Sequence, residues 1–165
     1  MSQNYLLFEA YDENLYTKIF FDLETGGFVV AHKEHGQYEL KGNKTIALLI
    51  VKHGYRIVLL ENQQDVVSAD ATLDDEVWEF KGIWDTGNLG NRIQKTIQKG
   101  KRQAANILVF IDQPYNLNDV SKGIDNAIKH DKKELIQKIG ILFQNGNLIF
   151  MSRAEVLDKS FRDKF

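Results

Sequence analysis

Two acidic side chains and a lysine lie close together in the sequence SADATLDDEVWEFKGI, whose alternation of apolar and polar residues predicts a β-hairpin. We expect the adjacent Asp74 and Asp75 to form a two-residue turn. Asp70 on the first strand then lies directly opposite Glu79 on the second. Lys81 shares the face of Glu79, because side chains two residues apart on a strand point in the same direction. The hairpin therefore predicts two carboxylates and an ammonium group on one face.

This cluster has the composition of a site for metal-assisted phosphodiester hydrolysis. Opposed side chains on paired strands lie about 5 Å apart at Cβ, so Asp70 and Glu79 repel one another without a counter-charge. Lys81 or a divalent cation would supply that charge, and carboxylate oxygens suit Mg²⁺ or Mn²⁺. Such an ion polarises the phosphate and lowers the pKa of a bound water, while the lysine orients that water or neutralises phosphate charge. We predict Asp70, Glu79 and Lys81 as catalytic residues, with Asp70 and Glu79 as the metal ligands.

Two other interpretations of the hairpin stay open. Charged residues are common on the solvated face of a hairpin, where they carry no chemistry. A turn of three residues would place Asp70 opposite Phe80 and disperse the cluster. Trp78 and Phe80 point to the opposite face, and their burial would favour the two-residue turn, because a slip by one residue would expose them.

The helix expected after the hairpin carries five basic side chains and no acidic one. Placed beside the acidic cluster, it would offer a row of cations to the phosphate backbone of a nucleic acid. A solvated, lysine-rich exterior is the alternative, since runs of charge commonly have that role. The predicted nucleic-acid-binding residues are Arg92, Lys95, Lys99, Lys101 and Arg102.

The elements that must position these side chains predict an α/β (α+β) fold, with a single mixed β-sheet flanked by helices. After residue 43 they follow the order helix, strand, hairpin, helix, strand, helix, hairpin and a short helix. Gly54 ends the first of these helices, and Asn145-Gly146 marks the turn of the second hairpin. The expected segments are 44–53, 55–61, 69–81, 87–105, 106–112, 116–137, 138–152 and 154–161.

The N-terminal part and the domain organisation complete this prediction. We expect residues 5–10 and 16–22 to form two short strands, or a strand and a turn. Another short strand follows over 28–31, and then a polar loop that contains His32 and His35. One domain over residues 1–165 is the simplest arrangement. It consists of N-terminal strands and a loop (1–42), a core that carries the motif (43–112), and a C-terminal helix, hairpin and short helix (113–165).

Composition restricts the function further. The chain of 165 residues has a net charge of −2, so nucleic-acid binding would need a local basic patch. It has no cysteine, which excludes thiolate zinc sites. We expect neither a signal peptide nor a transmembrane segment, because the longest apolar run is IALLIV. A zinc pair formed by His32 and His35 lacks a convincing third and fourth ligand, although either could be the base of a metal-independent ribonuclease.

The residues GYRIVLLEN, ADATLDDEVWEFKGI and NRIQKTIQKGKRQAANILVFI together resemble a known family over residues 43–112. They are similar to the C-terminal nuclease toxin domains of contact-dependent growth inhibition proteins and of phage-head-like polymorphic toxins. The motif follows the PD-(D/E)xK nuclease superfamily. By position, the resemblance implies that Asp70 and Glu79 bind the metal and that Lys81 is the catalytic lysine.

The sequence departs from the family pattern at three points. Ala69 stands where proline is usual, and Asp75 replaces the glycine of the hairpin turn, which would strain a type I′ turn. The glutamate that such nucleases often carry in the preceding helix has no counterpart near Asn43 or Lys44. Its loss would remove one metal contact.

The resemblance and the cluster together imply a metal-dependent endoribonuclease that cleaves tRNA and is neutralised by a cognate immunity protein. It would act in the cytoplasm of a target cell, with no membrane partner. A DNA endonuclease with the same residues is one alternative. The other is a non-enzymatic immunity or interaction module, in which the acidic hairpin docks onto a basic partner.

Overall fold

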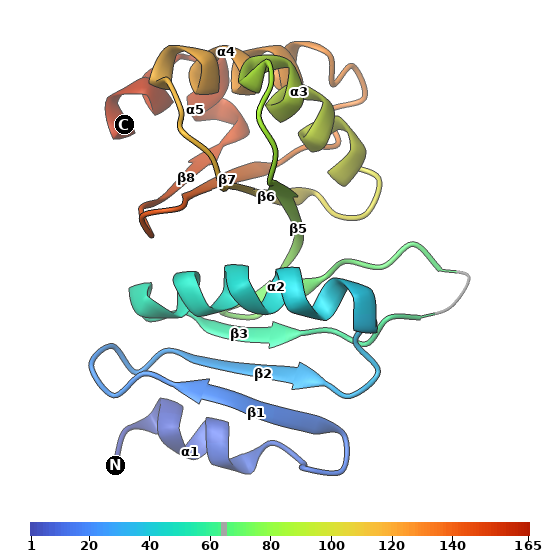
Figure 1. Cartoon of the computed structure of the whole chain (residues 1–165), viewed down its shortest axis with the longest axis vertical. Coiled ribbons are helices and arrows are strands. Elements are labelled where there is room, and N and C mark those ends of the chain that lie inside the picture. Colours follow the sequence, from blue (N-terminus) through green and yellow to red (C-terminus); the bar gives the residue numbers. More distant parts are fainter. Residues whose placement is uncertain (64–65) are drawn as a thin grey trace. The chain divides into compact units, whose positions relative to one another are not determined.

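The computed structural model of the chain describes residues 1–63 and 66–165. Its strands are hydrogen-bonded in the sequence order β1 to β8 and form one mixed sheet flanked by helices (Figure 1). This confirms the expected α/β (α+β) class. The chain also divides into two compact units, residues 1–78 and 79–165. Strand β5 (Glu76–Ile83) contributes its first three residues to the first unit and the others to the second.

The strand pairings of the first unit alternate between antiparallel and parallel. Strands β1 and β2 are antiparallel, β2 and β3 are parallel, and β3 and β4 are antiparallel. The parallel pair is connected through a helix whose buried side chains include Ile46, Ala47 and Ile50. The elements are α1 (Gln3–Ala10), β1 (Tyr16–Phe21), β2 (Phe28–His32), α2 (Gln37–Ile50), η1 (Val51–His53), β3 (Arg56–Leu59) and β4 (Ala71–Leu73).

Two predictions for this unit are wrong. The segment expected as a strand over 5–10 is the helix α1, whose N-cap Ser2 accepts a hydrogen bond from the Tyr5 amide. A short apolar run fits a strand or a helix equally well. Helix α2 begins at Gln37, well before the expected residue 44. Its N-cap is Gly36, which has no capping side chain, and no apolar stripe marks its first turns.

The β4–β5 hairpin has the predicted two-residue turn. Leu73 pairs with Glu76 and Ala71 pairs with Trp78. Asp74 and Asp75 both have positive φ angles, 46° and 72°, as a type I′ turn requires. The missing glycine is thus replaced by two aspartates in the left-handed region, a conformation that costs other residues about 1 kcal/mol or more.

An arginine holds this turn. The amide and the Nε of Arg56 donate to Oδ1 of Asp74 at 2.9 and 3.2 Å, and its Nη2 donates to Asp75 at 3.2 Å. These charge-assisted hydrogen bonds offset the strain of the turn. The register that they protect fixes which face each side chain of β5 occupies.

The second unit is built on parallel strands. The rest of β5, β6 and β7 are parallel, and β7 and β8 form the antiparallel hairpin predicted at Asn145-Gly146. Its core contains Ile93 and Ile97 of α3, which lie four residues apart and so share one face of the helix. The elements are α3 (Leu89–Gly100), β6 (Asn106–Ile111), α4 (Leu117–Lys129), β7 (Lys138–Phe143), β8 (Leu148–Ser152), α5 (Arg153–Leu157) and η2 (Ser160–Lys164).

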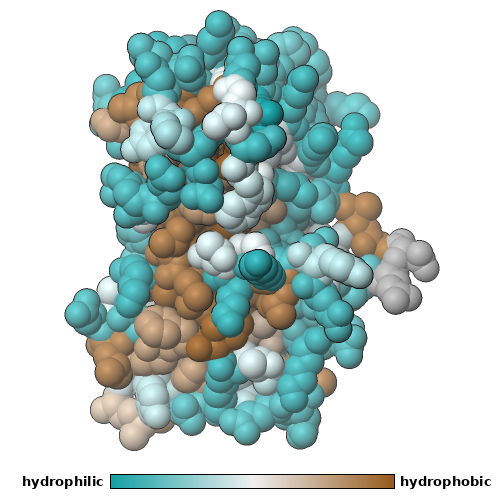
Figure 2. Space-filling view, viewed as in Figure 1, coloured by the Kyte–Doolittle hydropathy of each residue, from teal (hydrophilic) through white to brown (hydrophobic). Residues whose placement is uncertain are grey.

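The surface is mixed in character. Figure 2 shows hydrophobic side chains that reach the surface among a larger number of hydrophilic ones. Among the described residues, no helix is both long and apolar enough to cross a membrane.

Candidate active site

Asp70 lies in the first unit, directly before β4. The residue is buried, with 8% of its surface exposed. Its carbonyl accepts a hydrogen bond from the Leu60 amide at 2.9 Å, which extends the β3–β4 pairing by one step. The backbone of Asp70 is therefore held by the sheet, although the residue lies outside the strand.

Glu79 and Lys81 form an ion pair in the second unit. Nζ of Lys81 lies 2.7 Å from Oε1 of Glu79, which confirms that the two side chains share a face of β5. The Glu79 side chain is 1% exposed and that of Lys81 is 29% exposed. A solvated hairpin face does not describe Glu79, because this carboxylate is almost completely removed from water.

Helix α3 covers this face at Gly100. A Cβ placed on Gly100 would lie 3.6 Å from Cγ of Glu79 and 2.8 Å from Cγ2 of Ile107, the partner of Glu79 on β6. The second distance is shorter than side chains tolerate, so only glycine lets the helix end approach the strands this closely. Burial of the Glu79 carboxylate thus depends on a small residue in α3.

The predicted opposition of Asp70 and Glu79 stays a prediction. The observed pairs of β4 and β5 run from Leu73–Glu76 to Ala71–Trp78. Asp70 belongs to the first unit and Glu79 to the second.

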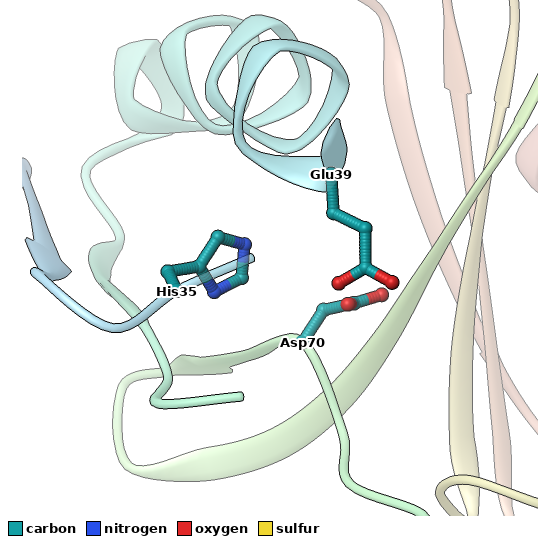
Figure 3. Close-up of side chains that lie close together, drawn as sticks. All are labelled: His35, Glu39 and Asp70. Carbon is teal, nitrogen blue, oxygen red and sulfur yellow. The ribbon is translucent and has the colours of Figure 1, made fainter. Parts of the chain in front are cut away.

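Asp70 lies close to two side chains that sequence analysis did not join to it. Donor atoms of His35, Glu39 and Asp70 all lie within 4.8 Å of one another. Figure 3 shows Glu39 extending from the start of α2 toward Asp70, with the His35 ring beside them. His35 comes from the turn after β2, and His35 and Asp70 are buried while Glu39 is exposed.

The helix before the hairpin therefore does carry a glutamate near Asp70, where none was expected. Sequence analysis placed residue 39 in a loop, because α2 starts at Gln37 without a capping side chain. An acidic residue in the first turn of a helix is a favourable position, and this is the signal that could have indicated the true start.

The two histidines of the loop have different environments. The His35 ring donates from Nδ1 to the Leu60 carbonyl at 2.6 Å, and its Nε2 lies 3.1 Å from Nδ2 of Asn43. His32 instead accepts a hydrogen bond from the Glu34 amide and packs its ring edge-on against Tyr16. Of these two histidines, His35 alone belongs to the cluster of possible metal ligands found among the described residues.

The donor set of the cluster fits a divalent cation. Carboxylates bind Mg²⁺, Mn²⁺ and Ca²⁺, and imidazole adds a ligand suited to transition metals. Glu39 and Asp70 would hold the cation through oxygen, and their two negative charges would be neutralised by it. The fit rests on residues of the first unit alone.

The basic residues of α3 and the turn after it have two kinds of role. Arg92 forms an ion pair with Asp85, and Nζ of Lys101 lies 3.3 Å from a carboxylate oxygen of the buried Asp131. Both of these cations are therefore engaged within the second unit. Among the described residues, Lys95, Lys99 and Arg102 form no ion pair, and all three are exposed. They are the members of the predicted row that remain available to a phosphate backbone.

Asp131 is the structural anchor of this region. Burial raises its pKa, but the Ile136 amide, Arg153, the Leu135 amide and Lys101 outweigh that effect and hold the pKa of this carboxyl below its ordinary value. Arg153 lies 2.7 Å from the carboxylate and the Ile136 amide lies 2.8 Å from it. Lys101 thus stabilises the fold.

The segment that contains the hairpin and the basic helix also has a family match. Residues 67–148 match the contact-dependent growth inhibition CdiA C-terminal domain. This CdiA C-terminal match covers just under half of the chain and includes Asp70, Glu79, Lys81 and α3. It begins after His35 and Glu39.

A solved structure has a similar fold. One chain of a CdiA-CT/CdiI toxin and immunity complex from Burkholderia pseudomallei superposes with a TM-score of 0.50 at 19% sequence identity. The similarity covers 70% of this chain and 85% of that chain. No curated protein matches the sequence. At this identity, the superposition shows a similarity of fold.

Proposed function

We propose that the chain is a toxin domain of a contact-dependent growth inhibition protein and acts as a metal-dependent endonuclease. The expected substrate is RNA, with tRNA favoured. The observation that carries the proposal is the Glu79–Lys81 ion pair, which lies within the segment that matches the CdiA C-terminal domain. A carboxylate that is 1% exposed is costly to bury, and such groups concentrate at functional sites.

Each residue has a stated role in this proposal. Asp70 is the proposed metal ligand of the first unit, with Glu39 beside it, and Glu79 is the proposed metal ligand of the second unit. Lys81, which is partly exposed and held by Glu79, places its ammonium group where it neutralises charge on the scissile phosphate. The cation, when bound, polarises the phosphate and provides hydroxide at neutral pH. Lys95, Lys99 and Arg102 bind the phosphate backbone of the substrate.

A cognate immunity protein is the proposed macromolecular partner. The similar solved structure is a toxin and immunity complex, and this supports a partner of the same kind here. Such a protein would have to block either the ion pair or the exposed cations of α3. Addition of a neutralising partner should therefore stop cleavage at a one-to-one ratio.

Cleavage assays with matched variants test the function. The purified chain is incubated with total RNA, purified tRNA and plasmid DNA, after treatment with EDTA and again with added Mg²⁺, Mn²⁺ or Zn²⁺. We expect metal-dependent cleavage of RNA, reduced about 100-fold or more in Glu79→Ala and Lys81→Ala. Lys132→Ala removes an exposed lysine of the same unit and should retain full activity.

The outcomes separate the hypotheses. Full activity in a folded Glu79→Ala or Lys81→Ala variant refutes the mechanism. Cleavage of plasmid DNA alone shows a DNA endonuclease with the same residues. Absence of cleavage with every substrate and ion, together with tight binding to a basic protein, shows an interaction module.

A further inference from the structure

The cluster of His35, Glu39 and Asp70 combines one nitrogen donor with two carboxylates (Figure 3). Donors bound to one tetrahedral ion lie about 3.3 Å from one another, given metal–ligand distances near 2.0–2.1 Å. The donor atoms of the cluster lie within 4.8 Å of one another, so they would have to move closer together around such an ion. Glu39 is exposed, so its side chain can rotate toward an ion held by His35 and Asp70.

The His35 ring is already oriented as metal-bound histidines are. A carbonyl oxygen only accepts hydrogen bonds, so the 2.6 Å contact with the Leu60 carbonyl requires the proton on Nδ1. The lone pair is then on Nε2. A metal-ligating histidine characteristically donates its other N–H to a carbonyl or carboxylate in this way, which fixes the tautomer and the ring plane.

A neighbouring amide occupies that lone pair in the metal-free chain. Nδ2 of Asn43 lies 3.1 Å from Nε2 of His35 and donates to it. Asn43 follows Glu39 by four residues on α2, so both side chains lie on the same face of the helix. At His35, an ion would displace this neutral hydrogen bond.

We propose that His35 is a ligand of the cation site, together with Glu39 and Asp70, and that the site therefore takes a late first-row ion such as Zn²⁺ or Co²⁺ in preference to Mg²⁺. The inference deepens the proposed function, on which it rests for the catalytic use of the ion. Imidazole is a good ligand for zinc and cobalt and a poor one for magnesium, which prefers oxygen. The expectation of Mg²⁺ or Mn²⁺ from two carboxylates alone is thus replaced by a mixed-donor site.

Metal binding to the full chain tests the proposal without substrate. Titration calorimetry with Zn²⁺ and Mg²⁺, and the visible absorption of bound Co²⁺, are measured on EDTA-treated protein. We expect His35→Gln to bind Zn²⁺ and Co²⁺ at least tenfold more weakly while its Mg²⁺ affinity changes less than about twofold. His35→Asn, whose amide nitrogen takes the place of Nδ1 and can still donate to the Leu60 carbonyl, should show the same selective loss and keep the conformation of the loop.

A matched histidine provides the control. His32→Gln changes the histidine three residues earlier, which lies outside the cluster, and should bind all three ions as the natural chain does. Glu39→Gln should lower the affinity for all three ions. Equal Zn²⁺ affinity in His35→Gln and the natural chain would overturn the proposal, as would micromolar Mg²⁺ binding without comparable Zn²⁺ binding.

A measurement on the natural sequence avoids dependence on the variants. In long-range ¹H–¹⁵N NMR spectra, Zn²⁺ should shift the Nε2 resonance of His35 and leave that of His32 in place. An unchanged His35 resonance at saturating Zn²⁺ contradicts the proposal. Zn²⁺ binding through His35 in a chain that cleaves no nucleic acid keeps this inference and refutes the proposed function. Mg²⁺-dependent cleavage that is unaffected by His35→Gln does the reverse.

Discussion

Replacement of Asp131 by asparagine should destabilise the second unit without removing any residue proposed to act on substrate. The carboxylate accepts from the Ile136 amide and forms ion pairs with Arg153 and Lys101. Asparagine keeps the shape and one acceptor oxygen but removes the charge. Arg153 and Lys101 are then left 16% and 17% exposed without a carboxylate.

The magnitude follows from these contacts. Hydrogen bonds to charged groups contribute about 1.5–3 kcal/mol each, and loss of one partner of a buried ion pair costs about 3–5 kcal/mol. Asparagine still accepts one hydrogen bond, and both cations regain some water because they are partly exposed. We therefore expect Asp131→Asn to lower the free energy of unfolding by about 3 kcal/mol at pH 7, at the lower end of the range.

The pH dependence of the stability difference tests whether the charge of Asp131 causes it. The folded chain holds the pKa of Asp131 below its ordinary value, so this carboxylate contributes stability above its unfolded pKa, near 3.9, and the contribution is lost as the pH falls through the folded pKa. The difference between Asp131→Asn and the natural chain should be constant from pH 7 to 5 and shrink below about pH 4. Urea unfolding followed by circular dichroism measures it.

A control variant and a clear threshold make this prediction falsifiable. Asp112→Asn changes an exposed aspartate of the same unit and should alter the free energy of unfolding by no more than about 0.5 kcal/mol. A deficit below about 1 kcal/mol for Asp131→Asn, or one that does not change with pH, refutes the reasoning.

Two further predictions concern the basic helix and the hairpin turn. Lys99→Ala should weaken nucleic-acid binding and lower the salt-dependence slope by about one, with unchanged stability, whereas Lys101→Ala should chiefly lower stability. Filter-binding titrations at several salt concentrations and urea unfolding measure both effects, and the opposite assignment would show that Lys101 is the residue that contacts substrate. Asp75→Gly should raise the free energy of unfolding by about 0.5 kcal/mol, because glycine tolerates the φ of 72° and the exposed Arg56–Asp75 ion pair that it removes contributes little. Asp74→Gly should give no such gain, since the Asp74 carboxylate accepts two hydrogen bonds from an arginine. A larger gain from Asp74→Gly than from Asp75→Gly would show that the strain lies chiefly at Asp74.

Much of the fold could be predicted from local signals. The order of elements after residue 43 is correct because each apolar run is bounded by a clear start or stop, such as Asn88, Gly54 and Asn145-Gly146. The register of the first hairpin followed from Trp78, whose burial a one-residue slip would have reversed.

The N-terminal elements show why the remainder could not be predicted. Helix α1 depends on a serine cap and on Phe8 packing against Phe21 and Phe28, and the last two are distant in sequence. Helix α4 was expected to reach residue 137 and ends at Lys129. Its continuation would have prevented the Ile136 amide from reaching Asp131. Asp131 is also held by Arg153, a tertiary contact that overrides helix propensity.

The part of the candidate site that lies on one strand was predictable, and the part that depends on non-local contacts was not. Spacing along one strand correctly placed Glu79 and Lys81 together, because strand periodicity is a local property. His35 and Glu39 were missed as partners of Asp70. Their proximity depends on where α2 begins and on how the chain returns after β3, and neither is encoded in a short motif.

The absence of a side chain at residue 100 has a consequence for charge. Glycine within a helix costs about 1 kcal/mol relative to alanine, yet here it lets α3 close over the strand that carries Glu79. One added methyl group would push against Ile107, lift the helix end and admit water to a carboxylate that is now dry. The volume of this single position therefore sets the local dielectric in which Glu79 attracts Lys81, so that a packing residue governs the electrostatics of the pair.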